Sequence, residues 1–460
     1  MSWASEELKT VNLGDARLNR RLMTAVEQLA EHPAQSVPQA CGSASAAKAV
    51  YRLWDNERVS DEAIRKAHVQ ATCRRCLEQP VVLAIQDTTD LDFTSHPATR
   101  GLGYLERSYL RGIQVHSILA ASENGVPQGL LHQRVWVWVR DDAERGKKHA
   151  RHTKATQDKE SQRWLDALAA TQVALPGVPC LVTVADREAD IFDFLAAPRS
   201  DNSHLLIRAA QNRRVDGEIG HLFDLLAQAP AVGIETVGSA RSKREAVVTL
   251  RHAPASIRPP GNGHPAGQAP VAVHAVLAEE ETPPPGTVAI RWLLLTTLPV
   301  AGEADVRRCL RRYGGRWRIE RDHFTLKSGG GVERLQRETA DRLERALATY
   351  GVVAWRLLWL TYQAREDDSV PCTVALQEHE WQSLYCKTHH SLTLPEHPPS
   401  LRQAVRWIAQ LGGFLGRKSD GEPGVKVLWR GFQRLTDIAD DWQLFHPQSS
   451  DYDHALVGNG

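Results

Sequence analysis

The first part of the chain repeats apolar residues with the period of a helix. Leu18, Leu22 and Val26 are spaced by four residues, which places them on one helix face. Three arginines between residues 17 and 21 lie mainly off that face. Ser60 precedes two acidic residues, the pattern of a capped helix start. We predict helices over most of residues 1–75.

Two short apolar runs further along have the pattern of buried strands, and each ends in an aspartate. Residues 80–87 and 179–186 are these runs, and their last residues are Asp87 and Asp186. We predict further strands at 113–120, 130–139 and 204–210, and helices at 159–173 and 189–197. Strands that alternate with helices predict a mixed α/β sheet.

The pattern changes again after about residue 211. Short β-type runs surround a stretch rich in Pro and Gly, which predicts a β-rich insertion over about 211–300; the runs are 246–250, 271–277 and 289–295. Helices are predicted from about 303 to 365, followed by a loop-like stretch. Residues 401–411 and 427–445 have the pattern of a final helical unit. The predicted organisation is helical at 1–75, α/β at 76–385 and helical at 386–460.

Composition and charge narrow the class of protein only slightly. The chain has 460 residues, and its 56 Lys and Arg nearly balance 55 Asp and Glu, for a net charge of +1. This balance excludes a polybasic tail protein, but a local basic patch for nucleic acid remains possible. Seven cysteines are too sparse for a disulfide framework. We see no signal peptide and no membrane span, so we expect a protein of the reducing cytoplasm.

The two aspartates that close the apolar runs are candidate metal ligands. A carboxylate at the end of a buried strand is held rigidly, and the pair Asp87 and Asp186 could bind a hard cation such as Mg²⁺. The alternative is that each aspartate starts a turn or caps the following helix.

A second group of polar residues is spaced around Glu320, on both sides of it, with the period of a helix. At about 100° per residue, its members fall within a stripe roughly 60° wide; they are Tyr313, Arg316, Glu320, His323 and Lys327. Gly314 and Gly315 can break the helix and leave Tyr313 on the preceding one. The stripe is either an exposed helix face with an Arg316–Glu320 pair, or an acid that completes a metal site beside phosphate-binding cations.

These features together resemble the DDE transposases of the IS-four family. The likeness covers almost the whole chain, in the same order; it includes Leu13–Leu22, Ala63–Ala67, Ala185–Ile191, Arg291–Thr296, Arg316–Glu320 and Leu411–Phe414, with the spacing Y-x2-R-x3-E-x6-K. The resemblance implies a ribonuclease-H-like core with a β-rich insertion, between an N-terminal helical DNA-binding domain and a C-terminal helical dimerisation domain.

The resemblance also implies a chemistry and a site. Asp87, Asp186 and Glu320 would be catalytic carboxylates that bind two Mg²⁺ ions, for which Mn²⁺ can substitute, and the ions would clamp the oxygens of an in-line phosphoryl displacement. The enzyme would be a cut-and-paste DNA transposase, a nuclease and strand transferase that cuts transposon ends through a DNA hairpin. Its partners would be double-stranded DNA and, when synapsed on DNA, a second copy of the chain. No membrane partner is implied, and the location would be the bacterial cytoplasm, with the nucleoid.

Further residues are implied as DNA contacts by position in the matching segments. Trp292 would stack on a flipped base, and Tyr313, Arg316 and Lys327 would hold the phosphates around it. His323 would contact the transferred strand, Arg208 would lie near the catalytic site, and Arg21 would touch transposon-end DNA. The alternatives are a core residue for Trp292, a helix-surface residue for His323 and a solvated basic helix for Arg21. The cationic segment 146–154 is either another DNA contact or a solvated loop.

Some features depart from the family or mislead. Phe324 stands where relatives tend to have a basic residue, and Asp90 and Asp92 offer extra acids beside Asp87. Cys73 and Cys76 have zinc-like spacing but lack a second pair, so we do not expect a zinc site. Two other functions stay open: a transposase-derived DNA-binding protein that does not cut, and a carboxylate-pair hydrolase such as a glycosidase. The hydrolase reading leaves the Arg and Lys of the stripe without a role.

Overall fold

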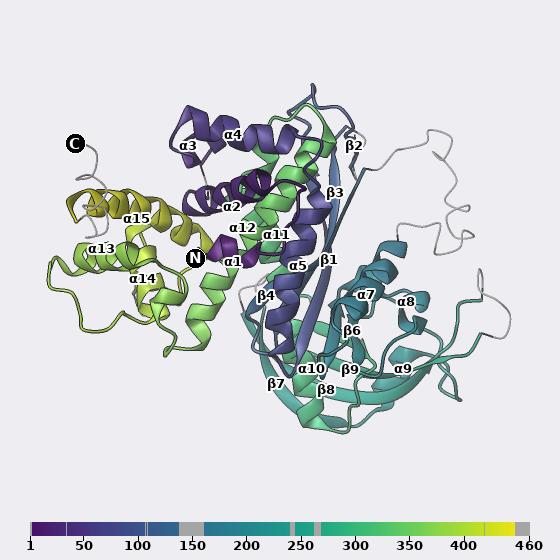
Figure 1. The fold of residues 1–460 in the computed structure, drawn as a ribbon. Coiled ribbons are helices and arrows are strands. Elements are labelled where there is room, and N and C mark those ends of the chain that lie inside the picture. Colours follow the sequence, from purple (N-terminus) through teal and green to yellow (C-terminus); the bar gives the residue numbers. More distant parts are fainter. Residues whose placement is uncertain are drawn as a thin grey trace, which may run out of the picture.

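The N-terminal helices pack beside a long central helix, and the last of them also packs on a large sheet (Figure 1). The structure is a computed structural model, which describes residues 2–33, 35–105, 107, 109–137, 161–239, 244–261, 268–417 and 419–446. The cationic segment 146–154 and residues 447–460 lie outside the described residues.

The helical prediction for the start of the chain is confirmed. The elements are α1 (Trp3–Glu7), α2 (Ala16–Glu31), α3 (Val37–Ala40), α4 (Ala44–Asp55) and α5 (Asp61–Leu77). On α2, Leu22 and Val26 are buried and Leu18 is half-buried, whereas the nearby arginines are exposed. Ser60 caps α5 by accepting a hydrogen bond from the backbone N–H of Ala63.

A ten-stranded mixed sheet forms the centre of the molecule. Its strands are β1 (Val82–Asp92), β2 (Gly103–Tyr104), β3 (Arg111–Ser122), β4 (Pro127–Trp136), β5 (Leu181–Ala185), β6 (Ser203–Arg208), β7 (Ala231–Ser239), β8 (Arg244–Ile257), β9 (Val271–Glu279) and β10 (Arg291–Thr296). Their order is β2-β3-β1-β5-β6-β10-β9-β8-β7, with β4 paired to β3. The pairs β4–β3 and β3–β1 are antiparallel, and β1–β5 and β5–β6 are parallel. The predicted mixed α/β class is confirmed.

The β-rich stretch continues this sheet. β7, β8 and β9 form an antiparallel meander, and β10 pairs with both β9 and β6. The sequence pattern indicated β8, β9 and β10 but missed β7 and the short helix α9 (Leu222–Gln228). β7 has no buried apolar face to give a signal, because both Ile234 and its neighbours are partly or fully exposed.

Helices cover the two faces of β1 differently. Val82 and Ala84 pack against Ala167 of α7 (Gln162–Ala174), whereas Leu83 and Ile85 belong to the core that contains α11 (Trp317–Phe324) and α12 (Ala340–Glu366). Successive side chains of a strand point to opposite faces. Odd-numbered residues of this part of β1 therefore face α11, and even-numbered residues face α7.

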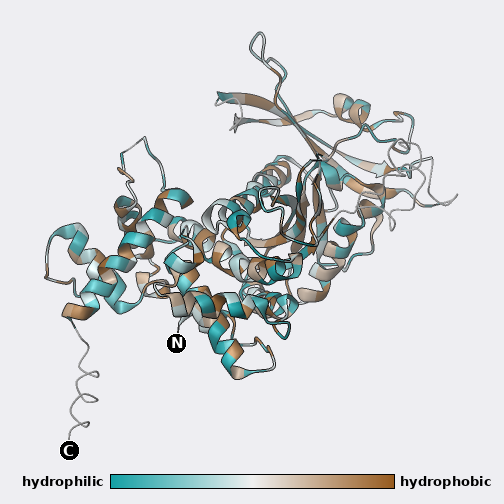
Figure 2. Ribbon diagram, turned by 90° about the horizontal axis from the view of Figure 1, so that it is seen from above, coloured by the Kyte–Doolittle hydropathy of each residue, from teal (hydrophilic) through white to brown (hydrophobic). Residues whose placement is uncertain are grey.

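The C-terminal part of the chain is helical, as predicted. It contains α13 (Glu378–His389), α14 (Leu401–Leu411) and α15 (Val425–Phe445). The loop-like stretch expected after residue 365 was wrong in part, because α13 lies within it, with Trp381 and Leu384 buried against α14 and α15. Brown and teal segments alternate along the helices, the colouring of amphipathic helices (Figure 2). None of the helices in the described ranges is long and apolar enough to cross a membrane.

Candidate active site

Asp87 lies within β1 rather than at its tip, so the expectation of a strand-terminal carboxylate was wrong for this residue. β1 runs on to Asp92 because its antiparallel partner β3 extends as far, whereas its parallel partner β5 ends at Ala185. Asp87 therefore lies beside the carboxyl end of β5, on the face that α11 covers. Its Oδ1 accepts a hydrogen bond of 2.9 Å from the backbone N–H of Thr88.

Asp186 does follow the end of a buried strand, as predicted. It also caps the short 3₁₀ turn 187–189, since its Oδ1 accepts a hydrogen bond of 2.9 Å from the backbone N–H of Glu188. The capping alternative is thus correct, and the second carboxylate oxygen remains for other partners. Asp190, four residues later, has a different role: it is buried and pairs with Arg213, so it holds the turn after β6.

Arg316 joins the third acid to the first. It begins α11, pairs with Glu320 one turn later, and places its Nη1 3.6 Å from Oδ2 of Asp87. The Arg316 side chain is only 10% exposed and that of Asp87 only 18%. The guanidinium therefore bridges two acids that are far apart in the sequence.

The pKa of Asp87 shows that the three acids share one electrostatic environment. Burial raises this pKa to about 7, Arg316 opposes the rise, and the charges of Asp186 and Glu320 add to it. Like charges act in this way only when they lie near one another. Asp186 and Glu320 therefore lie within electrostatic reach of Asp87.

The three acids do not form a ready metal cage in the described part of the chain. Among the described residues, no group of three or more His, Cys, Asp or Glu side chains is placed so that it could hold a metal ion. Arg316 lies between Asp87 and Glu320 where a cation would bind. The donor chemistry nevertheless fits a hard divalent ion, because a buried carboxylate beside two like charges is stabilised by such an ion.

Tyr313 ends the preceding helix, so the predicted break at Gly314 and Gly315 is confirmed. It lies near the end of α10 (Glu303–Gly314) and is buried. Its ring meets the ring of Trp292 edge to face, with centroids 5.7 Å apart. Arg208, at the end of β6, donates a hydrogen bond of 3.1 Å to the backbone carbonyl of Arg291, and lies within electrostatic reach of Tyr313. Trp292 is half-buried against the core.

His323 is buried, so the helix-surface alternative for this residue was wrong. Its pKa falls to about 3 because burial disfavours the charged ring and Lys327 repels the proton. Nε2 has no hydrogen-bond partner among the described residues. Lys327 is half-buried in the π-helical turn 325–329 that continues α11. Asp322 is also buried, and burial raises its pKa to about 7. No sequence signal distinguished the buried Asp322 from the exposed Arg321 beside it.

Lys426 supplies a positive charge beside Phe324, the position where a basic residue was missing. Phe324 stacks on Trp429 of α15 with ring centroids 6.0 Å apart. The Lys426 ammonium lies 5.2 Å from the Phe324 ring. Sequence reasoning missed Lys426, because nothing in the spacing relates residues about one hundred positions apart.

The remaining predicted residues lie apart from this site. Arg21 is exposed on α2, which packs on α4 and α12. Asp90 accepts a hydrogen bond from Gln114, and Asp92 is exposed, so the described contacts do not link either acid to Glu320. Cys73 and Cys76 are free thiols, and burial raises the pKa of Cys76 to about 12, as suits a core residue.

Two family models match the ends of the chain. Residues 1–59, which include α1 to α4, match the model described as transposase DNA-binding. Residues 352–445, from within α12 to the end of α15, match the model described as the transposase Tn5 dimerisation domain. The matched segments are the two helical ends of the chain, and the sheet with the three acids lies between them in the sequence.

Proposed function

We propose that this chain, a Tn5-like transposase, cuts transposon ends by metal-dependent phosphoryl transfer. It would then join the 3′-hydroxyl ends to target DNA. One observation carries the proposal. Asp87, Asp186 and Glu320 come from three separate segments, yet their charges act together on the pKa of Asp87. A DDE nuclease needs such a meeting of three acids, and a structural ion pair does not.

The strand order supports a ribonuclease-H-like core for this chemistry. Three antiparallel strands, β4, β3 and β1, are followed by two parallel strands, β5 and β6. Asp87 then lies on β1 and Asp186 directly after the neighbouring strand β5, and α11 carries Glu320 near them. The meander β7–β9 would be the β-rich insertion that the family resemblance implies.

Asp87, Asp186 and Glu320 would hold two divalent ions, Mg²⁺ or Mn²⁺ in its place. Bound ions of this kind supply Lewis-acid stabilisation of phosphoryl oxygens and lower the pKa of a bound water. The chain's own acids need no further role, since the reaction requires no protein nucleophile. Asp87 and Asp186 are already oriented by backbone N–H groups, so little reorganisation is needed at these residues.

The cations around the acids would hold DNA phosphates. Arg316 presents a planar guanidinium suited to two parallel hydrogen bonds, and Lys327 offers a point charge further along the stripe. Arg208 and Tyr313 lie within electrostatic reach of each other and of Arg316. A phosphate here would therefore meet several donors held by packing.

Trp292 would be the platform for a base flipped out during hairpin formation. Its half-buried ring is fixed edge to face by Tyr313, so one end is anchored while part of the side chain remains accessible. A stack between an aromatic ring and a base contributes about 1–3 kcal/mol, enough to offset much of the unstacking cost. His323, which is buried, would need the surrounding side chains to open before it could touch the transferred strand.

The two helical ends would supply DNA binding and pairing. The exposed Arg21 on α2 would contact transposon-end DNA from the region matched to the DNA-binding model. α13 to α15, within the region matched to the dimerisation model, would join two copies synapsed on DNA.

A second function is supported by one specific observation. Arg316 pairs with two of the three acids and would compete with a metal ion for them. A chain in which this pairing persisted on DNA would bind transposon ends without cutting them.

The test uses duplex DNA from the gene's own flanks, where inverted repeats supply the substrate, together with Mg²⁺. The wild-type chain should bind this DNA, nick it and form hairpins. Glu320→Ala should bind as well but not cleave, and Glu338→Ala, which changes an exposed acid, should cleave normally. Binding without cleavage by the wild type would favour the second function. Cleavage by Glu320→Ala would remove Glu320 from the site.

A further inference from the structure

The face of β1 opposite the three acids carries a row of polar side chains. Gln86 and Thr88 flank Asp87 and point toward α7, where apolar residues would be expected in a sheet core. His116, opposite Thr88 on β3, shares this face and is fully buried. Buried polar groups require hydrogen-bond partners, so each of these side chains should have one in the structure.

The row forms a continuous chain of hydrogen bonds. Thr88 Oγ1 lies 2.9 Å from Nδ1 of His116, and Nε2 of His116 lies 3.3 Å from Oε1 of Gln86. Burial lowers the pKa of His116 to about 3, so the ring is neutral. A hydroxyl can both donate and accept, so Thr88 can bond His116 and one further donor at the same time.

Arg163 of α7 is that donor, and it also reaches the other strand. Its Nε donates to Thr88 Oγ1 at 3.1 Å, and its Nη2 donates to Glu188 Oε2 at 2.9 Å. The Arg163 side chain is only 13% exposed and lies beside the rings of Trp136 and Trp164. Packing, the hydrogen bond to Thr88 and the ion pair with Glu188 therefore hold the planar guanidinium of Arg163 in place.

The two residues that Arg163 joins are the same two that orient the acids. The backbone N–H of Thr88 donates to Asp87, and the backbone N–H of Glu188 donates to Asp186, each at 2.9 Å. A single guanidinium thus links the holders of both carboxylates from behind the sheet. Through these two contacts Arg163 acts on the acids by way of Thr88 and Glu188.

We propose that Arg163 is a positioning residue that sets the separation of Asp87 and Asp186 for divalent-ion binding. The proposal rests on the proposed function, since it assigns those acids to a metal site. Two-ion sites tolerate little change in carboxylate spacing, and groups behind the ligands commonly control affinity. Lysine cannot replace arginine here, because a single ammonium lacks the planar fork that reaches two partners.

The test uses two measurements on the wild type and each variant. One is Mn²⁺ binding by electron paramagnetic resonance, and the other is the Mg²⁺ concentration that gives half-maximal nicking. Arg163→Met should weaken Mn²⁺ binding about tenfold to a hundredfold and raise the Mg²⁺ requirement. Arg163→Lys should not restore binding. DNA affinity without metal should stay at the wild-type value. The matched control is Arg134→Met, which removes an exposed arginine that pairs with Asp166 of the same helix; its Mn²⁺ affinity should be unchanged.

Thr88→Val keeps the backbone N–H and breaks the same link without altering α7. It should weaken Mn²⁺ binding in the same direction, and the double variant with Arg163→Met should be little worse than either single variant. Wild-type Mn²⁺ affinity in a folded Arg163→Met or Thr88→Val chain would overturn the positioning role and leave the proposed function intact. A wild-type chain that neither binds Mn²⁺ nor cuts DNA would overturn both.

Discussion

Asp87 is the residue whose charge state matters most to the proposed site. Its side chain is 18% exposed, and its pKa of about 7 lies well above the ordinary value of 3.8, because of burial and the nearby acids. The folded chain therefore keeps a proton on Asp87 that the unfolded chain releases. Stability from this residue is present below about pH 4 and is lost as pH rises through 7.

Asp87→Asn should remove the loss of folding stability that Asp87 causes as pH rises through about 7. Without divalent ions, the variant should be more stable than the wild type at pH 8 by roughly 2–4 kcal/mol, because no carboxylate is ionised in a buried site. Chemical unfolding of both chains across pH 4 to 8 measures the difference. Saturating Mg²⁺ should then stabilise the wild type and leave Asp87→Asn unchanged. A wild type that Mg²⁺ does not stabilise would argue against metal binding at Asp87.

Trp292→Ala tests the stacking platform. The variant should still nick transposon ends but form few hairpins, because nicking does not need the flipped base and hairpin formation does. Trp292→Phe keeps an aromatic face and should recover part of the hairpin product. Gel analysis of nicked and hairpin DNA over time separates the two steps. Equal loss of both steps would instead indicate that Trp292 only packs against Tyr313.

The sequence allowed Asp87, Asp186 and Glu320 to be named through a family resemblance, but it gave no sign of the groups that hold them. Arg163 lies 75 residues from Thr88 and 25 from Glu188, and within its own helix it is one polar residue among several. Pattern reasoning assigns a residue to a helix face; it does not identify the side chain across the interface. Burial of His323 was missed for the same reason.

At the scale of elements, the sequence predicted most helices and strands, and it erred where pairing partners decide the length. β1 was expected to end at Asp87, because the apolar run ends there. Its extension to Asp92 depends on β3, which offers backbone partners up to Gly112. The run of apolar residues measures burial on both faces, whereas strand length follows hydrogen-bond partners. β7 escaped prediction because it lacks a buried face.

The crossing of α14 and α15 depends on two glycines. A Cβ on Gly412 would collide with the backbone carbonyl of Val427, and one on Gly431 would collide with that of Ile408. Backbone atoms cannot move aside as a flexible side chain does. The two helices therefore approach as closely as they do only because both positions lack a side chain.

Gly431→Ala should push α15 away from α14. We expect a loss of about 1–3 kcal/mol or more in the free energy of unfolding, as in overpacked cores, together with weaker self-association. Gly424→Ala is the matched control, since it changes the residue before α15 and a Cβ there meets nothing within 4 Å. Denaturant unfolding and analytical ultracentrifugation measure the two effects. Equal stability of the two variants would show that the crossing tolerates a shift.

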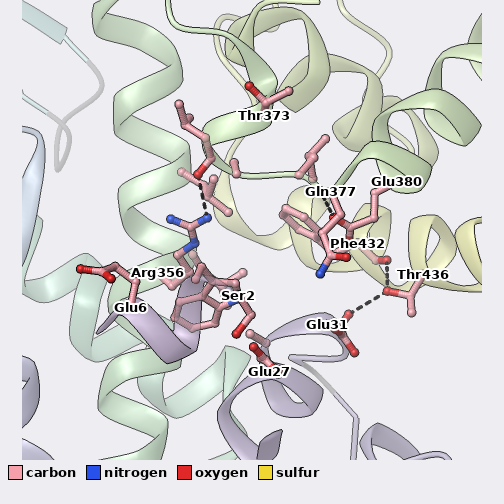
Figure 3. A pocket seen from close by; sticks show the side chains of 17 residues that line it. Ser2, Glu6, Glu27, Glu31, Arg356, Thr373, Gln377, Glu380, Phe432 and Thr436 are labelled. Atoms are coloured by element: carbon pink, nitrogen blue, oxygen red, sulfur yellow. Dashed lines mark hydrogen bonds between the residues drawn. The ribbon is translucent and has the colours of Figure 1, made fainter. Parts of the chain in front are cut away.

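At the scale of the whole molecule, a cavity of about 450 Å³ with several acidic residues in its lining lies between the region matched to the DNA-binding model and the dimerisation region. Figure 3 shows Glu27 and Glu31 of α2 on one side and Glu380 of α13 on the other, with Arg356 of α12 across the space. Burial raises the pKa of Glu31 to about 7, and the charges of Glu380, Glu27 and Asp440 add to the rise. Protonation of Glu31 would therefore remove a charge repulsion between α2 and the acids of α13 and α15.

Glu31→Gln should remove the part of the pH dependence of the free energy of unfolding that comes from Glu31. The folded wild type holds a proton on Glu31 that the unfolded chain releases above its ordinary pKa of 4.5, so this stability is lost as pH rises through about 7. The variant should exceed the wild type by about 1–3 kcal/mol at pH 8 and by much less at pH 5. Asp87 and Asp322 change the wild type in the same direction, but they are present in both chains and cancel in the comparison. Glu57→Gln, at an exposed acid between α4 and α5, should show no such pH-dependent difference. If Glu31→Gln and Glu57→Gln gave equal profiles in chemical unfolding, the two helical ends of the chain would be coupled by packing alone.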